Sequence, residues 1–199
     1  MTRRTQRDRS RATRAALAAT ARGLFADRGY AAVSADDVVS AAGLTRGALH
    51  HHFGDKAGLF RAVFEELEAE LTAELAVVIA AAPDTPTRMA AGLRAFLDIC
   101  ERPEVLRISL TDAPAVLGWT NWRAISAEHG LGLIVGLIER GRAEGVIIAQ
   151  PPEVLARLVL SAVIEAALLI GHAPDREATR GTVEPALLTL LSGLLIPHP

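Results

Sequence analysis

The chain has 199 residues, 50% of them hydrophobic and 22% charged, with a formal net charge of −2. This composition supplies a sizeable core for one large or two small domains and excludes disorder as the overall state. The single cysteine, Cys100, excludes an intrachain disulfide framework.

Charge is divided unevenly along the chain. Residues 1–61 contain 11 basic and 5 acidic residues, a balance of +6, whereas residues 62–199 contain 10 and 18, a balance of −8. A basic segment joined to an acidic one indicates that the basic part meets a polyanion and the acidic part does not. We therefore predict two domains, over 1–61 and 62–199. The basic start has no apolar segment behind it, so we do not expect a secretory signal.

Apolar residues recur at helical spacing along nearly the whole chain, and the sequence shows no strand pattern. A first helix is predicted over 9–28, where Gly29 would end it as a left-handed cap. A short second helix follows Ser34, an N-cap residue whose capping box Asp37 completes. The third helix opens at Thr45 and runs to residue 52 or 53.

The rest of the chain also predicts helices, separated by glycine and proline. They are expected over 56–82, 86–101, 103–112, 118–144, 152–172 and 175–196. Pro114 is expected to interrupt the chain, and the stretch GVIIAQPP after residue 144 is expected to be a loop or a short extended piece. The predicted fold class is therefore all-α, with about nine helices.

The two short helices within residues 34–53 and the turn AAGLT between them have the pattern of a helix-turn-helix. Glycine permits the sharp turn, and the apolar residue after it, Leu44, holds the two helices together. The second helix would be the recognition helix. Small or polar residues at its start let the backbone approach a phosphate or a base edge: Thr45, Arg46, Gly47 and Ala48. Arg46 can donate two parallel hydrogen bonds to guanine O6 and N7 in the major groove.

Three consecutive histidines, His50, His51 and His52, occupy the same helix. Neighbours on a helix lie ~100° apart, so three in a row fan across about 200° and cannot share one metal ion. A metal pair would need i and i+4 spacing, which none of the 6 histidines has. Leu49 and Phe53 are expected to face inward. We therefore favour contact between the histidines and DNA; solvated surface histidines without a role are the alternative.

The sequence YAAVSADDVVSAAGLTRGALHHHFGDKAGLFRAVF, residues 30–64, resembles the DNA-binding head of the TetR family of transcriptional regulators. That family has a hydroxyl residue opening the second helix, an alanine–glycine–apolar turn, a hydroxyl residue opening the recognition helix, then leucine, an aromatic pair and a lysine. These places are filled by Ser34, Ala42, Gly43, Leu44, Thr45, Leu49, His50, His51, His52, Phe53 and Lys56. One position departs from the pattern, because His50 stands where the family usually has tyrosine.

The resemblance and the residues together predict the DNA contacts. We expect them from Ser34, Thr45, Arg46, Gly47, Ala48, His50, His51, His52 and Lys56, and from Arg3 and Arg4 in the basic arm. Lys56 is the only lysine of the chain, and the dipole at a helix start disfavours a cation there. A phosphate partner would explain this position, although an exposed lysine with no role is the alternative. The arm could follow the DNA backbone or the minor groove, or it could be a solubilising tail.

In the TetR family the C-terminal helices form a ligand-binding and dimerisation domain, in which the last two helices form a four-helix bundle with those of the second subunit. The resemblance places these helices at about 152–172 and 179–196, and both segments are apolar on more than one face. The apolar run 154–171 is nearly long enough to span a bilayer. However, Arg157 and Glu165 lie inside it, and a charge at mid-helix costs ~2.5–3.5 kcal/mol on insertion scales. We therefore expect a helix of a soluble protein.

The stretch 112–130 contains both tryptophans of the chain. A few polar residues lie at helical spacing beside them, and such a helix suits the wall of a ligand pocket. The candidate pocket residues are Trp119, Trp122, Arg123, Ser126 and His129. Ordinary core packing with a polar edge is the alternative that the sequence leaves open.

These observations lead to one functional prediction and one alternative. The prediction is a cytoplasmic, ligand-responsive transcriptional regulator, in this family most often a repressor. It would bind a near-palindromic DNA operator as a homodimer and would be released by a small-molecule effector. No catalytic motif, metal site or cofactor is expected, since HExxH, GxSxG and phosphate-loop patterns are absent from the sequence. The alternative is a helical carrier of a lipid-like molecule without a DNA role, against which the basic head argues.

Overall fold

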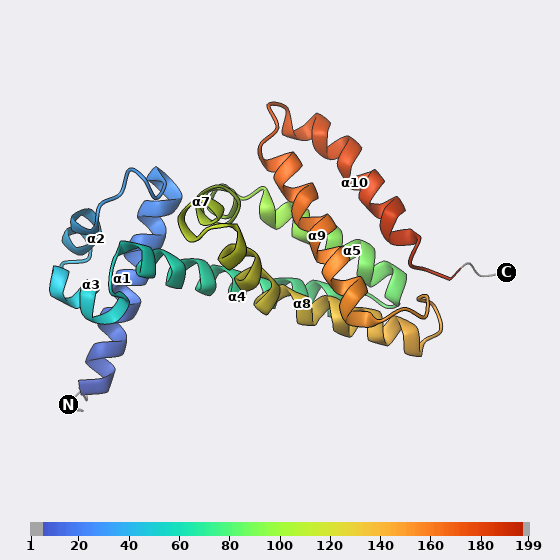
Figure 1. Ribbon diagram of the computed structural model, residues 1–199, viewed down its shortest axis with the longest axis horizontal. Coiled ribbons are helices and arrows are strands. Elements are labelled where there is room, and N and C mark those ends of the chain that lie inside the picture. The colour runs from blue at the N-terminus through green and yellow to red at the C-terminus, as the bar shows by residue number, and fades with distance from the viewer. Residues whose placement is uncertain (1–5, 197–199) are drawn as a thin grey trace. The chain divides into compact units, whose positions relative to one another are not determined.

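Helices make up most of the computed structural model, which describes residues 6–196 (Figure 1). Within this range the only β-type pairing is an isolated bridge between Ile147 and Leu195, and the all-α fold predicted from the sequence is confirmed. The elements are α1 (Gln6–Arg28), α2 (Ala35–Ala41), α3 (Arg46–Phe53), α4 (Lys56–Ala81), α5 (Thr85–Cys100), α6 (Pro103–Val105), the π-helical η1 (Leu106–Asp112), α7 (Ala113–Leu117), α8 (Trp119–Ala143), α9 (Pro152–Gly171) and α10 (Arg176–Ser192).

The chain divides into two compact units. The first contains residues up to Leu67 together with Pro103–Trp122, and the second contains Glu68–Arg102 together with the residues from Arg123 onward. Both α4 and α8 therefore supply residues to each unit. The domain boundary expected between residues 61 and 62 stays a prediction, because a compact unit and a functional domain are not the same thing.

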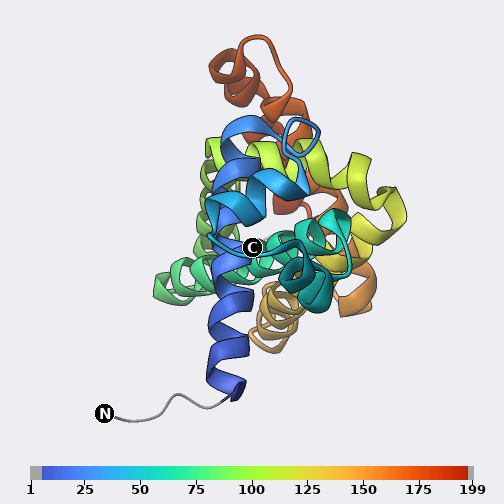
Figure 2. The ribbon, with the colours of Figure 1, turned by 90° about the vertical axis from the view of Figure 1, so that its left-hand side faces the viewer.

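Aromatic residues form the core of the first unit. Phe25 of α1 and Phe60 of α4 are fully buried with their ring centroids 5.3 Å apart, and Tyr30 packs against both rings. The short helices α2 and α3 pack against α1 and against each other (Figure 2). Gly29 ends α1 with a φ of +77°, so the predicted left-handed cap is confirmed. The helix α1 already includes Gln6, the first described residue, and so covers more of the chain than the predicted start at residue 9.

A segment far along the sequence completes the first unit. Both α6 and η1 pack against α1. Two polar contacts fasten them: Glu104 accepts hydrogen bonds from the Arg22 guanidinium at 2.6 and 3.1 Å, and Asp112 accepts one from the backbone N–H of Tyr30 at 2.8 Å. The first unit thus depends on contacts between residues 82 positions apart.

The conformation of this segment differs from the regular helix expected over 103–112. Residues Leu106–Asp112 are π-helical, and the Thr111 hydroxyl donates to the carbonyl of Leu106 five residues back at 2.8 Å. Pro114 does not interrupt the chain as expected. It stands in the first turn of α7, where a residue without an N–H is tolerated because that donor has no partner inside the helix.

In the second unit, α9 contacts both α5 and α10. The final helix ends at Ser192 and not at residue 196 as predicted, because the backbone after it turns to another partner. The N–H of Ile148 donates to Leu194 at 3.0 Å, and the N–H of Ile196 donates to Val146 at 2.9 Å. By its length and composition α9 is apolar enough to cross a membrane. Less than half of its most apolar stretch is buried within the described structure. One such helix is weak evidence for a membrane span, because the core helices of other proteins pass the same test.

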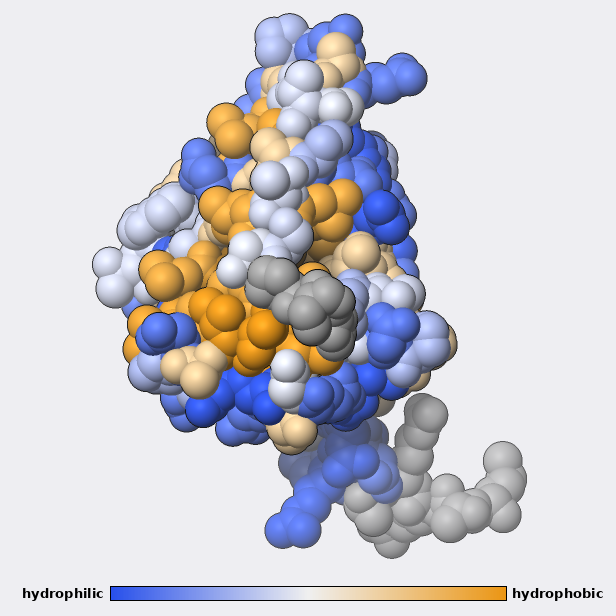
Figure 3. Space-filling model, turned by 90° about the vertical axis from the view of Figure 1, so that its right-hand side faces the viewer, coloured by the Kyte–Doolittle hydropathy of each residue, from blue (hydrophilic) through white to orange (hydrophobic). Residues whose placement is uncertain are grey.

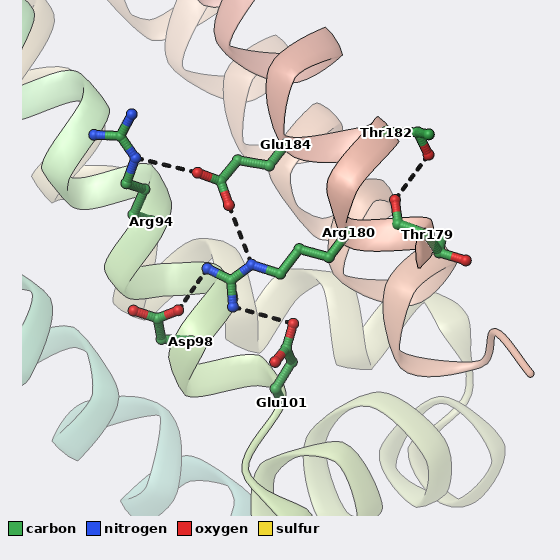
Figure 4. A network of polar contacts seen from close by, with 7 residues as sticks. All are labelled: Arg94, Asp98, Glu101, Thr179, Arg180, Thr182 and Glu184. Carbon is green, nitrogen blue, oxygen red and sulfur yellow. Dashed lines mark hydrogen bonds and ion pairs between the residues drawn. The ribbon is translucent and has the colours of Figure 1, made fainter. Parts of the chain in front are cut away.

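An arginine joins α10 to α5 in this unit (Figure 4). The Arg180 guanidinium donates to Asp98 and, at 3.1 Å each, to Glu101 and Glu184. Glu184 also accepts from Arg94 of α5 at 3.1 Å. Partial burial disfavours the charge of Arg180, but the hydrogen bonds to Asp98 and Glu184 outweigh it and raise the pKa of this side chain. One cation therefore holds three carboxylates that would repel one another without it.

We expect Arg180→Met to lower the free energy of unfolding by about 1–2 kcal/mol, because three carboxylates then lose a shared, partly buried donor. The measurement is the midpoint of urea unfolding at fixed protein concentration. Arg176→Met is the matched control, since Arg176 is an exposed arginine at the start of the same helix. Equal losses in the two variants would contradict a special role for Arg180.

Candidate nucleic-acid interface

The helix-turn-helix begins with a fully formed cap. The backbone N–H of Asp37 donates to the Ser34 hydroxyl at 3.1 Å, and the backbone N–H of Ser34 donates to the Asp37 carboxylate at 2.8 Å. The predicted capping box is therefore confirmed. The bond from the Ser34 backbone, with one from its hydroxyl, holds the pKa of Asp37 below its usual range. Whether Ser34 also contacts DNA stays a prediction.

The turn between α2 and α3 follows the predicted pattern. Gly43 has a φ of +64°, a backbone conformation that an L side chain rarely adopts. The N–H of Leu44 donates to the carbonyl of Val39 at 2.8 Å, and the Leu44 side chain is half-buried beneath the turn. Thr45 then caps α3 by accepting a hydrogen bond from the N–H of Ala48 at 3.2 Å.

Helix α3 has a buried and an exposed side. Leu49 is only 4% exposed, and Phe53 is half-buried with the Arg14 guanidinium 5.0 Å from its ring centroid. On the other side Arg46, Gly47, His50 and His51 are exposed, while Ala48 and His52 lie at the flank. The imidazoles of His51 and His52 meet edge to face at 4.9 Å. The inward placement of Leu49 and the outward placement of His50 and His51 agree with the sequence prediction.

Arg46 has a partner that the sequence did not indicate. Its Nε and Nη2 atoms donate to the two carboxylate oxygens of Asp36 on α2. Hydrogen bonding to Arg46 holds the pKa of Asp36 below its usual range, against an opposing effect of partial desolvation. Asp36 and Arg46 lie ten positions apart, so no helical spacing rule connects them.

Lys56 also has partners within the chain. Its Nζ donates to the carbonyls of Tyr30 at 3.0 Å and Val33 at 2.8 Å, and it lies 3.8 Å from the centroid of the Tyr30 ring. These contacts fasten the loop between α1 and α2 to the start of α4. They explain a cation at a helix start without a phosphate contact, and that contact stays a prediction. An ammonium has three N–H donors, and these two hydrogen bonds use two of them.

The other predicted site residues are placed as follows. Arg3 and Arg4 lie outside the described residues. Trp119 is 59% exposed whereas Trp122 is 1% exposed, and their ring centroids are 4.8 Å apart.

Arg123 donates to the Ser161 hydroxyl on α9 at 2.7 Å, Ser126 is buried, and His129 is half-buried. The five candidate pocket residues thus differ widely in exposure, and a shared ligand site stays a prediction. No three histidine, cysteine, aspartate or glutamate side chains within residues 6–196 gather closely enough to hold a metal ion. Burial raises the pKa of the Cys100 thiol, with Glu68 and Glu101 adding to the effect, and this disfavours the thiolate form.

The exposed side of α3 can donate hydrogen bonds from a guanidinium and from imidazoles beside small residues that allow close approach. Such a surface suits phosphate oxygens and base edges in a DNA groove. It is presented on a helix whose opposite side is buried, so its side chains keep a fixed spacing.

Comparison with known proteins gives matches to both parts of the chain. The family described as "Bacterial regulatory proteins, tetR family" matches residues 17–63, and "Tetracyclin repressor-like, C-terminal domain" matches residues 86–194. Among solved structures, a TetR-family transcriptional regulator from Pectobacterium atrosepticum superposes with a TM-score of 0.87 at 38% identity, covering 98% of this chain and 100% of that one.

Two curated relatives extend these matches. The transposon Tn10 TetC protein of Escherichia coli is 27% identical over 161 residues, 77% of this chain and 78% of that protein. The HTH-type transcriptional regulator CymR of Pseudomonas putida is 44% identical over 70 residues, 35% of this chain and 34% of that protein.

We expect Lys56→Met to lower the free energy of unfolding by about 1–3 kcal/mol in the absence of DNA, because the carbonyls of Tyr30 and Val33 lose a charged donor. Urea unfolding followed by circular dichroism measures the loss. Arg61→Met is the control, since its exposed i,i+4 pair with Glu65 contributes only about 0.3–0.5 kcal/mol. A Lys56→Met variant as stable as the wild type would show that the lysine serves only an external partner.

Proposed function

Because the chain belongs to the TetR family of transcriptional regulators, we propose that it binds a near-palindromic DNA operator as a homodimer and acts as a repressor. The exposed side of α3 carries this proposal: its outward side chains are the ones that a groove-binding helix requires, while Leu49 anchors the other side. In simple helix-turn-helix dimers the two recognition helices enter major grooves ~34–36 Å apart. Such a regulator works in the cytoplasm.

The DNA contacts divide into two kinds under this proposal. Arg46 contacts base edges, and His50, His51 and the small residues Gly47 and Ala48 lie against the groove. Backbone contacts come from Ser34, Thr45, His52, Lys56, Arg3 and Arg4. The first kind sets the base preference, and the second sets the position of the protein on the duplex.

An apolar surface on the last two long helices supports the homodimer. Val154, Leu158 and Leu169 of α9 are 55%, 63% and 52% exposed, and Leu190 of α10 is 61% exposed. Apolar side chains gather on this side of the molecule (Figure 3). Burying such residues against a second copy removes apolar area from water, which contributes roughly 25 cal/mol per Å². A four-helix bundle of two α9 and two α10 helices would cover them.

The proposed effector is a small molecule bound by the C-terminal domain. Trp119, Trp122, Arg123, Ser126 and His129, in the first turns of α8, are its candidate contacts. An effector releases DNA only if it binds more tightly to a state with wrongly spaced recognition helices than to the DNA-binding state. The second candidate function, a helical carrier without a DNA role, requires the same ligand site but predicts no DNA affinity.

Arg46→Ala should cost ~1–3 kcal/mol of binding free energy on a specific duplex and relax the base preference, whereas Lys56→Ala should weaken binding to all sequences alike. Fluorescence anisotropy with duplexes from DNA flanking the gene and with random DNA measures both effects. Binding should fall steeply with salt, because counterions are released from phosphates. Equal losses on both kinds of DNA for both variants would refute this division, and no salt-dependent binding at all would favour the carrier.

Leu158→Arg combined with Leu190→Arg should convert the dimer to monomers, because two charges would be buried in the proposed bundle. Light scattering on the eluting protein gives the mass. Val77→Arg is the matched control: it places the same charge at an apolar residue of α4 that is 71% exposed. The dimer interface is elsewhere if the double variant keeps the dimer mass or if Val77→Arg loses it.

A further inference from the structure

The pair of Asp36 and Arg46 leaves one edge of the guanidinium available. A guanidinium carries five N–H donors in a planar fork. Asp36 accepts from Nε and Nη2, which together form one edge of the planar group. The end of the fork, formed by one N–H of Nη1 and the second N–H of Nη2, is not used by this contact. Two parallel donors therefore point away from the carboxylate.

Both partners stand on anchored backbone. The capping box of Ser34 and the buried Val38 hold α2, and the Thr45 cap and the buried Leu49 hold α3. The pair itself lies at the surface, where the side chain of Arg46 is 73% exposed and that of Asp36 is 57% exposed. An ion pair so exposed contributes little to folding. Its physical consequence is orientation, since two hydrogen bonds to one carboxylate fix the plane of the guanidinium.

We propose that Asp36 is a positioning residue that holds Arg46 ready to recognise guanine at one base step of each half-site. This inference rests on the proposed function. The free end of the guanidinium has the spacing of guanine O6 and N7 in the major groove. Holding an otherwise flexible arginine in the bound orientation removes part of the entropy cost of binding. Arg46 also offsets the negative charge of Asp36, which would otherwise be repelled by the phosphates.

The test is base selection by the full-length chain from a pool of duplexes with a randomised centre. The wild type should enrich guanine at one step of each half-site, and Arg46→Ala should lose that preference. Asp36→Ala should reduce the preference for guanine at the same step by about three- to tenfold and leave the other positions unchanged. Asp36→Asn keeps one acceptor oxygen, so its preference for guanine should lie between those of the wild type and Asp36→Ala. It provides a second readout if the alanine variant is poorly folded.

The control for charge is Asp27→Ala, which removes an exposed carboxylate from α1 of the same unit. Both aspartate variants lose one negative charge, so overall affinity for DNA should stay equal or rise in both. Only the Asp36 variants should lose the preference for guanine. This difference separates orientation of Arg46 from a general effect of charge.

Two outcomes would overturn the inference alone. Asp36→Ala could keep the full guanine preference while binding all duplexes more tightly, which would leave Asp36 with a charge effect only. Alternatively, Arg46→Ala could keep every base preference, which would place Arg46 on a phosphate. A wild-type chain that enriches no sequence and shows no salt-dependent binding would instead remove the proposed function, and the inference with it.

Discussion

The burial of Leu49 is the constraint on which the candidate interface depends. Helix α3 has eight residues, and isolated helices shorter than ~12–15 residues are marginal in water. Its conformation must therefore come from tertiary contacts: Leu49 at 4% exposure, the Thr45 cap and the packing of Phe53 near Arg14. Once Leu49 is fixed, helical geometry decides which residues point outward. Arg46, His50 and His51 form a surface because the other side of the helix is held.

The position of α2 depends in turn on the loop that precedes it. The backbone of Tyr30 is bonded on both sides, since its N–H donates to Asp112 and its carbonyl accepts from Lys56. Lys56 also bonds the carbonyl of Val33, one residue before the Ser34 cap. Side chains from α4 and from η1 thus satisfy backbone groups in the loop between α1 and α2 that have no partner within those helices. The helix-turn-helix is thus supported in part by Asp112, which lies outside the 35-residue stretch that carries the family resemblance.

How much of this was predictable follows from the range of each interaction. The capping box of Ser34 and the turn at Gly43 depend on neighbours a few residues away, and helical periodicity places Leu49 on the apolar side of α3, so sequence rules describe all three well. The pair of Asp36 and Arg46 depends on how two helices cross, and the contacts of Lys56 depend on where a loop folds back.

The longest-range features were missed entirely. The π-helical conformation of Leu106–Asp112 accompanies contacts with α1, and the early end of α10 follows from pairing between residues 146–148 and 194–196.

The net charge of residues 1–61 was also an incomplete guide to where the protein attracts DNA. Five arginines of this segment form ion pairs within their own unit: Arg14, Arg22, Arg28, Arg46 and Arg61. Such pairs cancel much of their field at a distance. The basic excess therefore lies mainly toward the start of α1, where Arg7, Arg9 and Arg11 are exposed. Under the function proposed above, attraction to the duplex comes mainly from the arginines at the start of α1, whereas discrimination between sequences comes from Arg46. The Asp36–Arg46 pair is locally neutral, so it adds little attraction, but it presents oriented donors.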